Sequence, residues 1–183
     1  MKILAISGST RQQSTNMALL MAIKAASPND IAITVFDGIG NLPVFLLDLE
    51  GPNLPQSVQD FLRLIAQNDG LLISSPEYIR GIPGGLKNAI DWLVSGDQII
   101  GKPIALVHAS HRGDDMLVAL RKVLSTISSN FNEELFFRLP MMKETPEAIQ
   151  EILKVAENRQ GVDAFLRDFM SFWQNQLGSQ PLR

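Results

Sequence analysis

The sequence predicts an α/β fold: a five-stranded parallel sheet with the strand order 2-1-3-4-5, covered by helices on both faces. Apolar segments of strand length alternate along the chain with segments whose apolar residues recur every three or four positions, which is the pattern of repeated βαβ units. Three of the strand segments are apolar without alternation, as expected for strands buried on both faces. Two of them lead directly into a polar or a glycine- and proline-rich loop followed by a helix, a connection that lines ligand crevices in parallel sheets.

These elements follow one another along the chain, so we expect residues 1–183 to form a single domain. The expected strands are residues 2–7, 31–36, 70–75, 103–109 and about 133–138. The expected helices between them are about 14–26, 55–67, 84–95 and 113–128.

Two regions depart from this alternation. Residues 37–54 contain several glycines and prolines and no clear period, and so long a loop in a compact domain indicates a functional segment or an interface. The tail is helical, with one apolar stripe on Ile149 and Leu153 and a second that begins at Val162. Because the two stripes are out of phase at about 100° per residue, we expect a break near residues 159–161.

Composition excludes several classes of protein. The formal net charge of −3 provides no basic surface for nucleic acid, and the absence of cysteine excludes disulfides and cysteine-ligated clusters. No run reaches about 18 apolar residues, so no membrane span is expected. The stretch Met1–Ile6 is too short and apolar for a signal peptide. We therefore expect a cytoplasmic protein that binds neither nucleic acid nor membrane.

The first candidate site is the polar loop that follows the first strand, SGSTRQQSTN at residues 7–16. Where it enters the next helix, unpaired backbone N–H groups and the positive end of the helix dipole favour an anion such as a phosphate. Ser9, Ser14 and Asn16 can add hydrogen bonds, and Arg11 a charge-assisted one. The alternative is that these side chains only cap the helix, and for Ser14 alone the two interpretations are equal. The loop matches neither the nucleoside-triphosphate P-loop nor the G-x-G-x-x-G pattern.

The second candidate site is the loop SSPEYIRGIPGG at residues 74–85, after the third strand. Its prolines restrict the backbone and its glycines permit tight turns and close approach, so its amides suit the edge of a planar ring. Tyr78, the only tyrosine, is the residue that could stack on such a ring. The alternative is a surface turn in which Glu77 and Arg80 form a weak exposed pair.

A third loop, residues 109–115, follows the fourth strand and should lie beside the second. His111 and Arg112 are candidates for contact with a ring edge or an anionic substrate, although a single histidine is more often structural. His108 is expected to end a buried strand. The two acids that close the loop, Asp114 and Asp115, are expected to begin the next helix rather than to bind a metal.

Trp92 lies off the apolar stripe of the helix at 84–95. An aromatic side chain on the outer face of a helix beside a ligand loop favours a subunit interface over an isolated exposed tryptophan.

The chain resembles the NADPH-dependent FMN reductase family, whose quinone, azo-dye and chromate reductases share a flavodoxin-like three-layer α/β/α sandwich. The similarity covers about residues 2–140 and rests on Ser7-Gly8-Ser-x-Arg-x-x-Ser-x-Asn16, Pro76-Glu77-Tyr78, Pro83-Gly84 and Leu86-Lys87-Asn88-Ala89-Ile90-Asp91-Trp92. It implies bound FMN, NADPH or NADH as co-substrate, and a homodimer or homotetramer with Trp92 near the interface.

The resemblance also assigns residues to the cofactor. It implies that the phosphate meets Ser9, Arg11, Ser14, Thr15 and Asn16, that the isoalloxazine meets Pro76, Glu77, Tyr78, Ile79 and Gly81, and that Ser110 contacts the cofactor from the third loop. No catalytic side chain is expected, because the cofactor carries the chemistry. No metal is expected, because two adjacent acids in a chain with only two histidines make a weak metal site. Two positions depart from the family: Ile79 stands where many members have asparagine, and His111-Arg112-Gly113 replaces a glycine-rich loop. Both bear on the electron acceptor and on the nucleotide preference.

The expected function is transfer of two electrons from NAD(P)H through FMN to a quinone, flavin, azo dye or similar acceptor. A flavodoxin-type electron carrier is disfavoured by the small net charge. A phospho-acceptor signalling domain needs an acid at the end of the third strand, where this chain has Ser74 and Ser75. A flavin-binding protein without turnover is the remaining alternative.

Overall fold

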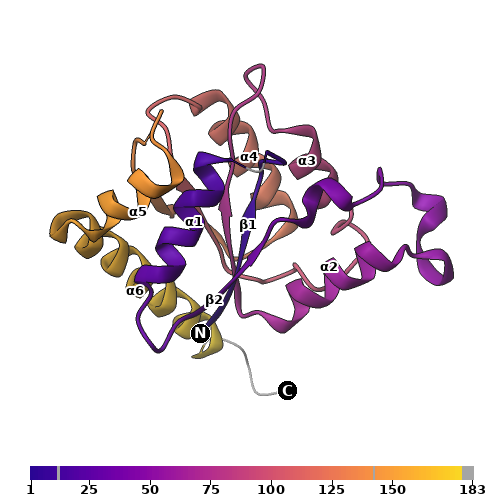
Figure 1. Cartoon of the computed structure of the whole chain (residues 1–183). Coiled ribbons are helices and arrows are strands. Elements are labelled where there is room, and N and C mark those ends of the chain that lie inside the picture. Colours follow the sequence, from indigo (N-terminus) through magenta and orange to yellow (C-terminus); the bar gives the residue numbers. More distant parts are fainter. Residues whose placement is uncertain (12, 142, 179–183) are drawn as a thin grey trace.

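The computed structural model describes residues 1–11, 13–141 and 143–178. Five parallel strands form one sheet with the order β2-β1-β3-β4-β5, which confirms the predicted topology (Figure 1). The strands are β1 (Lys2–Ser7), β2 (Ala32–Phe36), β3 (Gly70–Ser74), β4 (Ile104–His108) and β5 (Phe131–Arg138). All residues of β3 and β4 are buried, in agreement with their uninterrupted apolar sequences.

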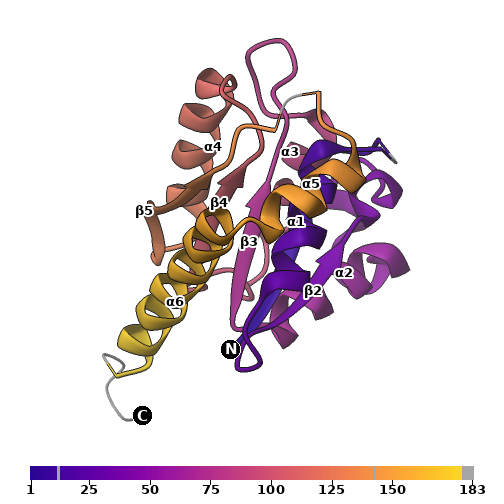
Figure 2. The same cartoon turned by 60° about the vertical axis from the view of Figure 1, so that its left-hand side comes forward.

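Helices cover both faces of the sheet and make the three layers of a flavodoxin-like sandwich (Figures 1 and 2). Strand residues alternate between two apolar cores, so that Ile3 and Ala5 belong to one and Leu4 and Ile6 to the other. The first core is closed by α1 (Thr15–Ala26), α5 (Pro146–Lys154) and α6 (Ala156–Gly178). The second is closed by α2 (Gln56–Gln67), α3 (Gly84–Asp91) and α4 (Asp114–Ile127).

The ends of β1 and β3 are joined where the first two candidate loops begin. The N–H of Gly8 donates to the carbonyl of Ser74 at 2.7 Å, which continues the pairing of the two strands by one residue. A Cβ at residue 8 would lie 2.6 Å from Oγ of Ser75, so this close approach requires glycine. The two candidate loops therefore leave the sheet side by side.

The long loop between β2 and α2 contains three single-turn 3-10 helices, η1 (Gly38–Asn41), η2 (Leu47–Leu49) and η3 (Gly51–Asn53). It extends away from the sheet on the side of α2 and α3 (Figure 1). Val44, Leu46 and Leu47 are exposed on it.

The expectation that Trp92 is exposed at a subunit interface is wrong, because Trp92 is buried within the chain itself. Its Nε1–H donates to the carbonyl of Pro43 at 2.8 Å, and the ring of Phe45 meets it edge-on at a centroid distance of 5.0 Å. Asn88, one turn earlier, accepts from the Phe45 N–H at 2.8 Å and donates to the Pro43 carbonyl at 2.9 Å. Trp92 belongs to the core between the sheet and α2, α3 and α4, and the long loop folds over it through Pro43 and Phe45.

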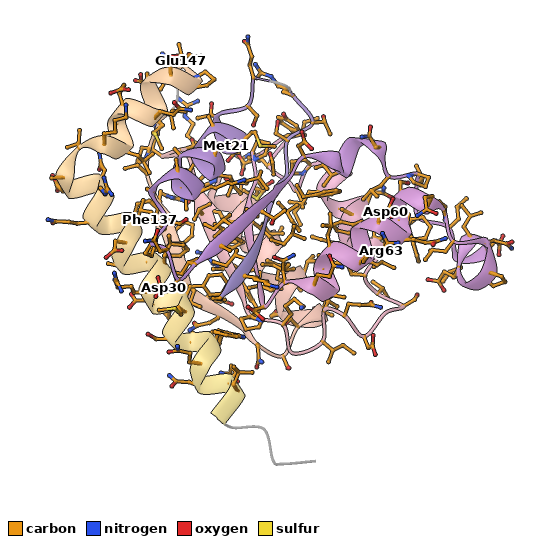
Figure 3. The ribbon with its side chains drawn as sticks, turned by 60° about the horizontal axis from the view of Figure 1, so that its bottom comes forward. Met21, Asp30, Asp60, Arg63, Phe137 and Glu147 are labelled. Atoms are coloured by element: carbon orange, nitrogen blue, oxygen red, sulfur yellow. The ribbon has the colours of Figure 1, made fainter. Side chains whose placement is uncertain are left out.

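The predicted break in the tail occurs earlier than expected. Helix α5 ends at Lys154 and α6 begins at Ala156, with Val155 extended between them, whereas Gly161 lies inside α6. A Cβ at Gly161 would lie 3.2 Å from the ring of Phe137 on β5, so this glycine allows close helix packing rather than a break. Figure 3 shows Phe137 beside the long helix α6. None of the described helices is both long and apolar enough to cross a membrane.

Candidate functional site

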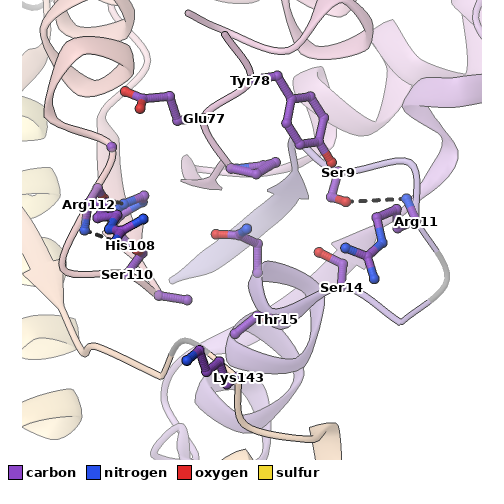
Figure 4. A pocket seen from close by; sticks show the side chains of 14 residues that line it. Ser9, Arg11, Ser14, Thr15, Glu77, Tyr78, His108, Ser110, Arg112 and Lys143 are labelled. Carbon is purple, nitrogen blue, oxygen red and sulfur yellow. Dashed lines mark hydrogen bonds between the residues drawn. The ribbon is translucent and has the colours of Figure 1, made fainter. Parts of the chain in front are cut away.

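A pocket of about 390 Å³ lies where the carboxyl ends of β1, β3 and β4 meet. This is the position at which open parallel sheets bind ligands, and the volume falls in the usual range for a small-molecule site. Nine of the eleven sequence-predicted cofactor residues line it: Ser9, Arg11, Ser14, Thr15, Asn16, Pro76, Glu77, Tyr78 and Ser110 (Figure 4).

The polar loop after β1 brings the N-terminus of α1 to one side of the pocket. Ser14 is the N-cap of α1, and its Oγ accepts from the N–H of Met17 over a long 3.4 Å, so the capping interpretation holds for this residue even though it also lines the pocket. Oδ1 of the buried Asn16 accepts from Oγ–H of Ser74 at 2.9 Å, which ties the first turn of α1 to the end of β3. The first turn of this helix contains no acid. The arrangement suits an anion.

The loop after β3 is a tight hairpin. Tyr78 and Gly81 exchange backbone hydrogen bonds of 3.2 and 3.0 Å, and the two residues between them have positive φ, 49° at Ile79 and 57° at Arg80. Two central residues with positive φ define a type I′ turn, which normally carries asparagine, aspartate or glycine. Ile79 is fully exposed at the tip, and neither Ile79 nor Gly81 lines the pocket. Their contact with a cofactor stays a prediction, while Tyr78 is half-exposed at the pocket wall.

Replacing Ile79 with glycine or asparagine is expected to raise the free energy of unfolding by about 1 kcal/mol, because a β-branched residue is strained at positive φ. Urea unfolding of the flavin-free protein measures this. Ile100 is also exposed but has no positive φ, so Ile100→Gly should destabilise and serves as the control. If both glycine variants lower the free energy of unfolding by the same amount, the turn at Ile79 is unstrained.

The third loop is bound to the second by Glu77. Its Oε2 accepts from the N–H of Met116 at 2.9 Å, in the first turn of α4. The N-cap of α4 is Gly113, which has no side chain to offer, so a carboxylate from another loop performs the capping. Next to it, Arg80 and Asp115 form an exposed ion pair at 3.5 Å, which adds little stability. As predicted, Asp114 and Asp115 begin this helix.

His108 forms a wall of the pocket at the end of β4, where the prediction placed it. Its Nε2 lies 2.5 Å from the carbonyl oxygen of Arg112, which can only accept, so Nε2 carries the proton. Burial lowers the pKa of His108 below its ordinary value, and the hydrogen bond to Arg112 opposes this. The imidazole is therefore neutral at pH 7, and its hydrogen bond to the Arg112 carbonyl joins the end of β4 to the third loop.

Five pocket residues were not among the predicted cofactor ligands: His108, Ala109, Arg112, Gly113 and Lys143. The sequence had named Arg112 as a candidate for an anionic substrate, and it lies in the pocket, whereas its neighbour His111 does not. No sequence pattern pointed to Lys143 as a site residue. It belongs to the connection between β5 and α5 and reaches the pocket only through the tertiary fold. In the described part of the chain, no three histidine or acidic side chains are grouped as a metal site would need.

Comparison with known proteins identifies the family of this chain. The NADPH-dependent FMN reductase family matches residues 1–137. A 2-hydroxy-1,4-benzoquinone reductase from Burkholderia sp is 39% identical over 113 residues, which are 60% of this chain and 61% of that protein. The quinone reductase of Escherichia coli K12 is 31% identical over 116 residues, covering 62% and 61%. The chain thus spans about three fifths of the length of the relatives it matches.

A solved structure agrees on the fold. The flavoenzyme NAD(P)H:(acceptor) oxidoreductase FerB from Paracoccus denitrificans superimposes with a TM-score of 0.72 at 23% identity, over 93% of this chain and 98% of that one. The polar turn after β1 and the hairpin after β3 border one pocket, and the family match extends over both. The chain therefore belongs to the NADPH-dependent FMN reductase family.

Proposed function

We propose that the protein is an FMN-dependent NAD(P)H oxidoreductase that reduces quinones or similar acceptors. One observation supports this most. The start of α1, which suits an anion, and the hairpin after β3 border one pocket, and the size of that pocket suits a small ligand. The chain that forms this pocket belongs to the FMN reductase family.

The residues of the pocket fit FMN. The loop after β1 supplies hydroxyls, an amide, the guanidinium of Arg11 and the free N–H groups at the start of α1, which together suit a phosphate. At the other end, Pro76 and Tyr78 offer flat apolar surface for a ring. The carboxylate of Glu77 already accepts from Met116, so it positions the hairpin rather than facing the ring as an unpaired charge.

FMN held in this pocket would supply the redox chemistry, a two-electron exchange between a nicotinamide nucleotide and an acceptor. The side chains of the pocket would bind the cofactor and orient it. Arg11 and the start of α1 would hold the phosphate end, and the hairpin and the third loop would border the ring. Neutral His108 keeps the third loop in place without adding a charge beside the ring. We expect no side chain to serve as an obligatory acid, because water can supply the protons.

Two measurements test this function. The purified protein should carry, or acquire on addition of FMN, a yellow flavin spectrum, and it should oxidise NADPH or NADH when a quinone is added. Reduction with each nucleotide followed by quinone, azo dye, free flavin and chromate identifies the acceptor. A protein that never binds FMN is not a flavin reductase. One that binds FMN and oxidises neither nucleotide is a flavin-binding protein without turnover.

The protein is also proposed to be a homo-oligomer. The exposed apolar side chains Val44, Leu46 and Leu47 on the long loop, rather than Trp92, are the surface we assign to the contact. Sedimentation equilibrium at micromolar concentration should give a mass above 20.2 kDa, the mass of one chain. A single-chain mass there would contradict the assignment.

A further inference from the structure

The pocket has more positive charge than the loop after β1 alone provides. Three cationic side chains line it, Arg11, Arg112 and Lys143, against one carboxylate, Glu77, which is held by the N–H of Met116. None of the three cations forms an ion pair with any residue that the structure describes. In a protein with a net charge of −3, this concentration of unpaired cations indicates a ligand with more than one negative charge.

Lys143 is brought to the pocket by a segment that is fixed on both sides. After β5, the N–H of Leu139 donates to the carbonyl of His108 and that of Met141 to the carbonyl of Ala109, both at 3.0 Å, so the chain continues along the end of β4. The side chain of Met141 is buried in the core under α1. Its carbonyl accepts from the N–H of Glu144 at 3.2 Å, which closes a turn with Lys143 at φ 75°.

Helix α5 then holds the other side of this turn. Thr145 caps α5, with its Oγ1 accepting from the N–H of Ala148 at 3.2 Å. Ile149 and Leu153 of α5 share the core with Leu19 of α1. The backbone of Lys143 is therefore fixed relative to α1, and Figure 4 shows its side chain at the Thr15 side of the helix start, with Arg11 on the Ser14 side.

We propose that Lys143 is the second cation for the phosphate of the flavin, and that it makes the pocket selective for FMN over riboflavin. This inference rests on the proposed function. A phosphate monoester carries about −1.5 to −2 charges at pH 7, and one guanidinium with one helix end supplies about +1.5, so the dianion leaves charge for a further cation. A flexible ammonium supplies the missing charge without needing a fixed geometry. Arg112 belongs to the third loop, between His108 and Gly113, and is left for an anionic substrate or the nucleotide.

The test uses the full chain stripped of flavin and titrated with FMN and with riboflavin, with binding followed by flavin fluorescence. Lys143→Met should weaken FMN binding about tenfold, the size expected for one charge-assisted contact, and leave riboflavin binding unchanged. It should also lower the slope of log Kd against log salt concentration, and Lys143→Arg should restore both. Lys24→Met, in the last turn of α1, removes an exposed charge away from the pocket and should change neither flavin.

Other outcomes overturn the inference. Equal weakening for both flavins would mean that Lys143 only supports the loop. Unchanged FMN binding with a raised KM for NADPH would assign Lys143 to the nucleotide instead. The wild-type protein tests the proposed function separately. If it prefers FMN to riboflavin but oxidises no nucleotide, the proposed activity is wrong. The comparison of the two flavins in the Lys143 variants still decides the role of Lys143. A wild type that binds no FMN contradicts both.

Discussion

Gly113→Ala is expected to lower the free energy of unfolding by about 2–4 kcal/mol and to weaken FMN binding. Gly113 has φ 103°, which L residues rarely adopt, and a Cβ there would lie 2.7 Å from Nε2 and 2.9 Å from Cε1 of His108. The imidazole cannot move aside, because it is buried and donates to the carbonyl of Arg112. The strain therefore falls on the third loop and the start of α4. Urea unfolding and FMN titration of the same variant measure the two effects.

Gly84→Ala, at the start of α3, provides the matched control. Gly84 is the first residue of α3, it has no positive φ, and a Cβ there meets no atom within 4 Å. Alanine at this position should leave stability unchanged or raise it slightly, since alanine is the better helix former. The double variant Gly113→Ala with His108→Ala should cost less than the two single changes added together, because the overlap is then removed. Similar results for the two alanine variants would contradict the proposed steric conflict.

The sheet and its helices could be predicted because they depend on local pattern. Continuous apolar runs identified β3 and β4, and both are buried throughout. The loop residues that meet in the pocket could be predicted as well, since neighbouring parallel strands must end at the same edge. For this reason Ser9 and Tyr78 were assigned to one site although they lie far apart in the sequence.

The errors arise where distant segments meet. Trp92 was expected on the outer face of its helix, but it is buried, and the loop that covers it is held by Asn88 through hydrogen bonds that no local pattern reveals. The break in the tail was assigned near residues 159–161 because the two apolar stripes are out of phase, whereas it lies at Val155 and Gly161 accommodates Phe137 inside α6. Lys143 was missed for the same reason: its place in the pocket follows from the pairing of Met141 with Ala109.

Glu77→Ala is expected to cost about 1–2 kcal/mol of unfolding free energy, the usual range for loss of a helix N-cap. The carboxylate at 2.9 Å from the N–H of Met116 is the cap that Gly113 cannot provide, and it is also the hydrogen bond that joins the hairpin after β3 to α4. Its removal should therefore loosen both walls of the pocket and raise the Kd for FMN. Hydrogen exchange should show faster exchange at the first turn of α4, while the amides of β3 stay protected.

Two variants separate the hydrogen bond from the charge. Glu77→Gln keeps an oxygen that can accept from Met116 and should lose only the interaction of the charge with the helix dipole, about 0.3–1 kcal/mol. Asp115→Ala removes the neighbouring exposed pair with Arg80 at 3.5 Å and should cost less than about 1 kcal/mol, with FMN binding unchanged. If Glu77→Gln is as damaging as Glu77→Ala, the charge rather than the cap holds the two loops together. If Asp115→Ala matches Glu77→Ala in both measurements, the link between the loops is the ion pair, and Glu77 has no special part in shaping the pocket.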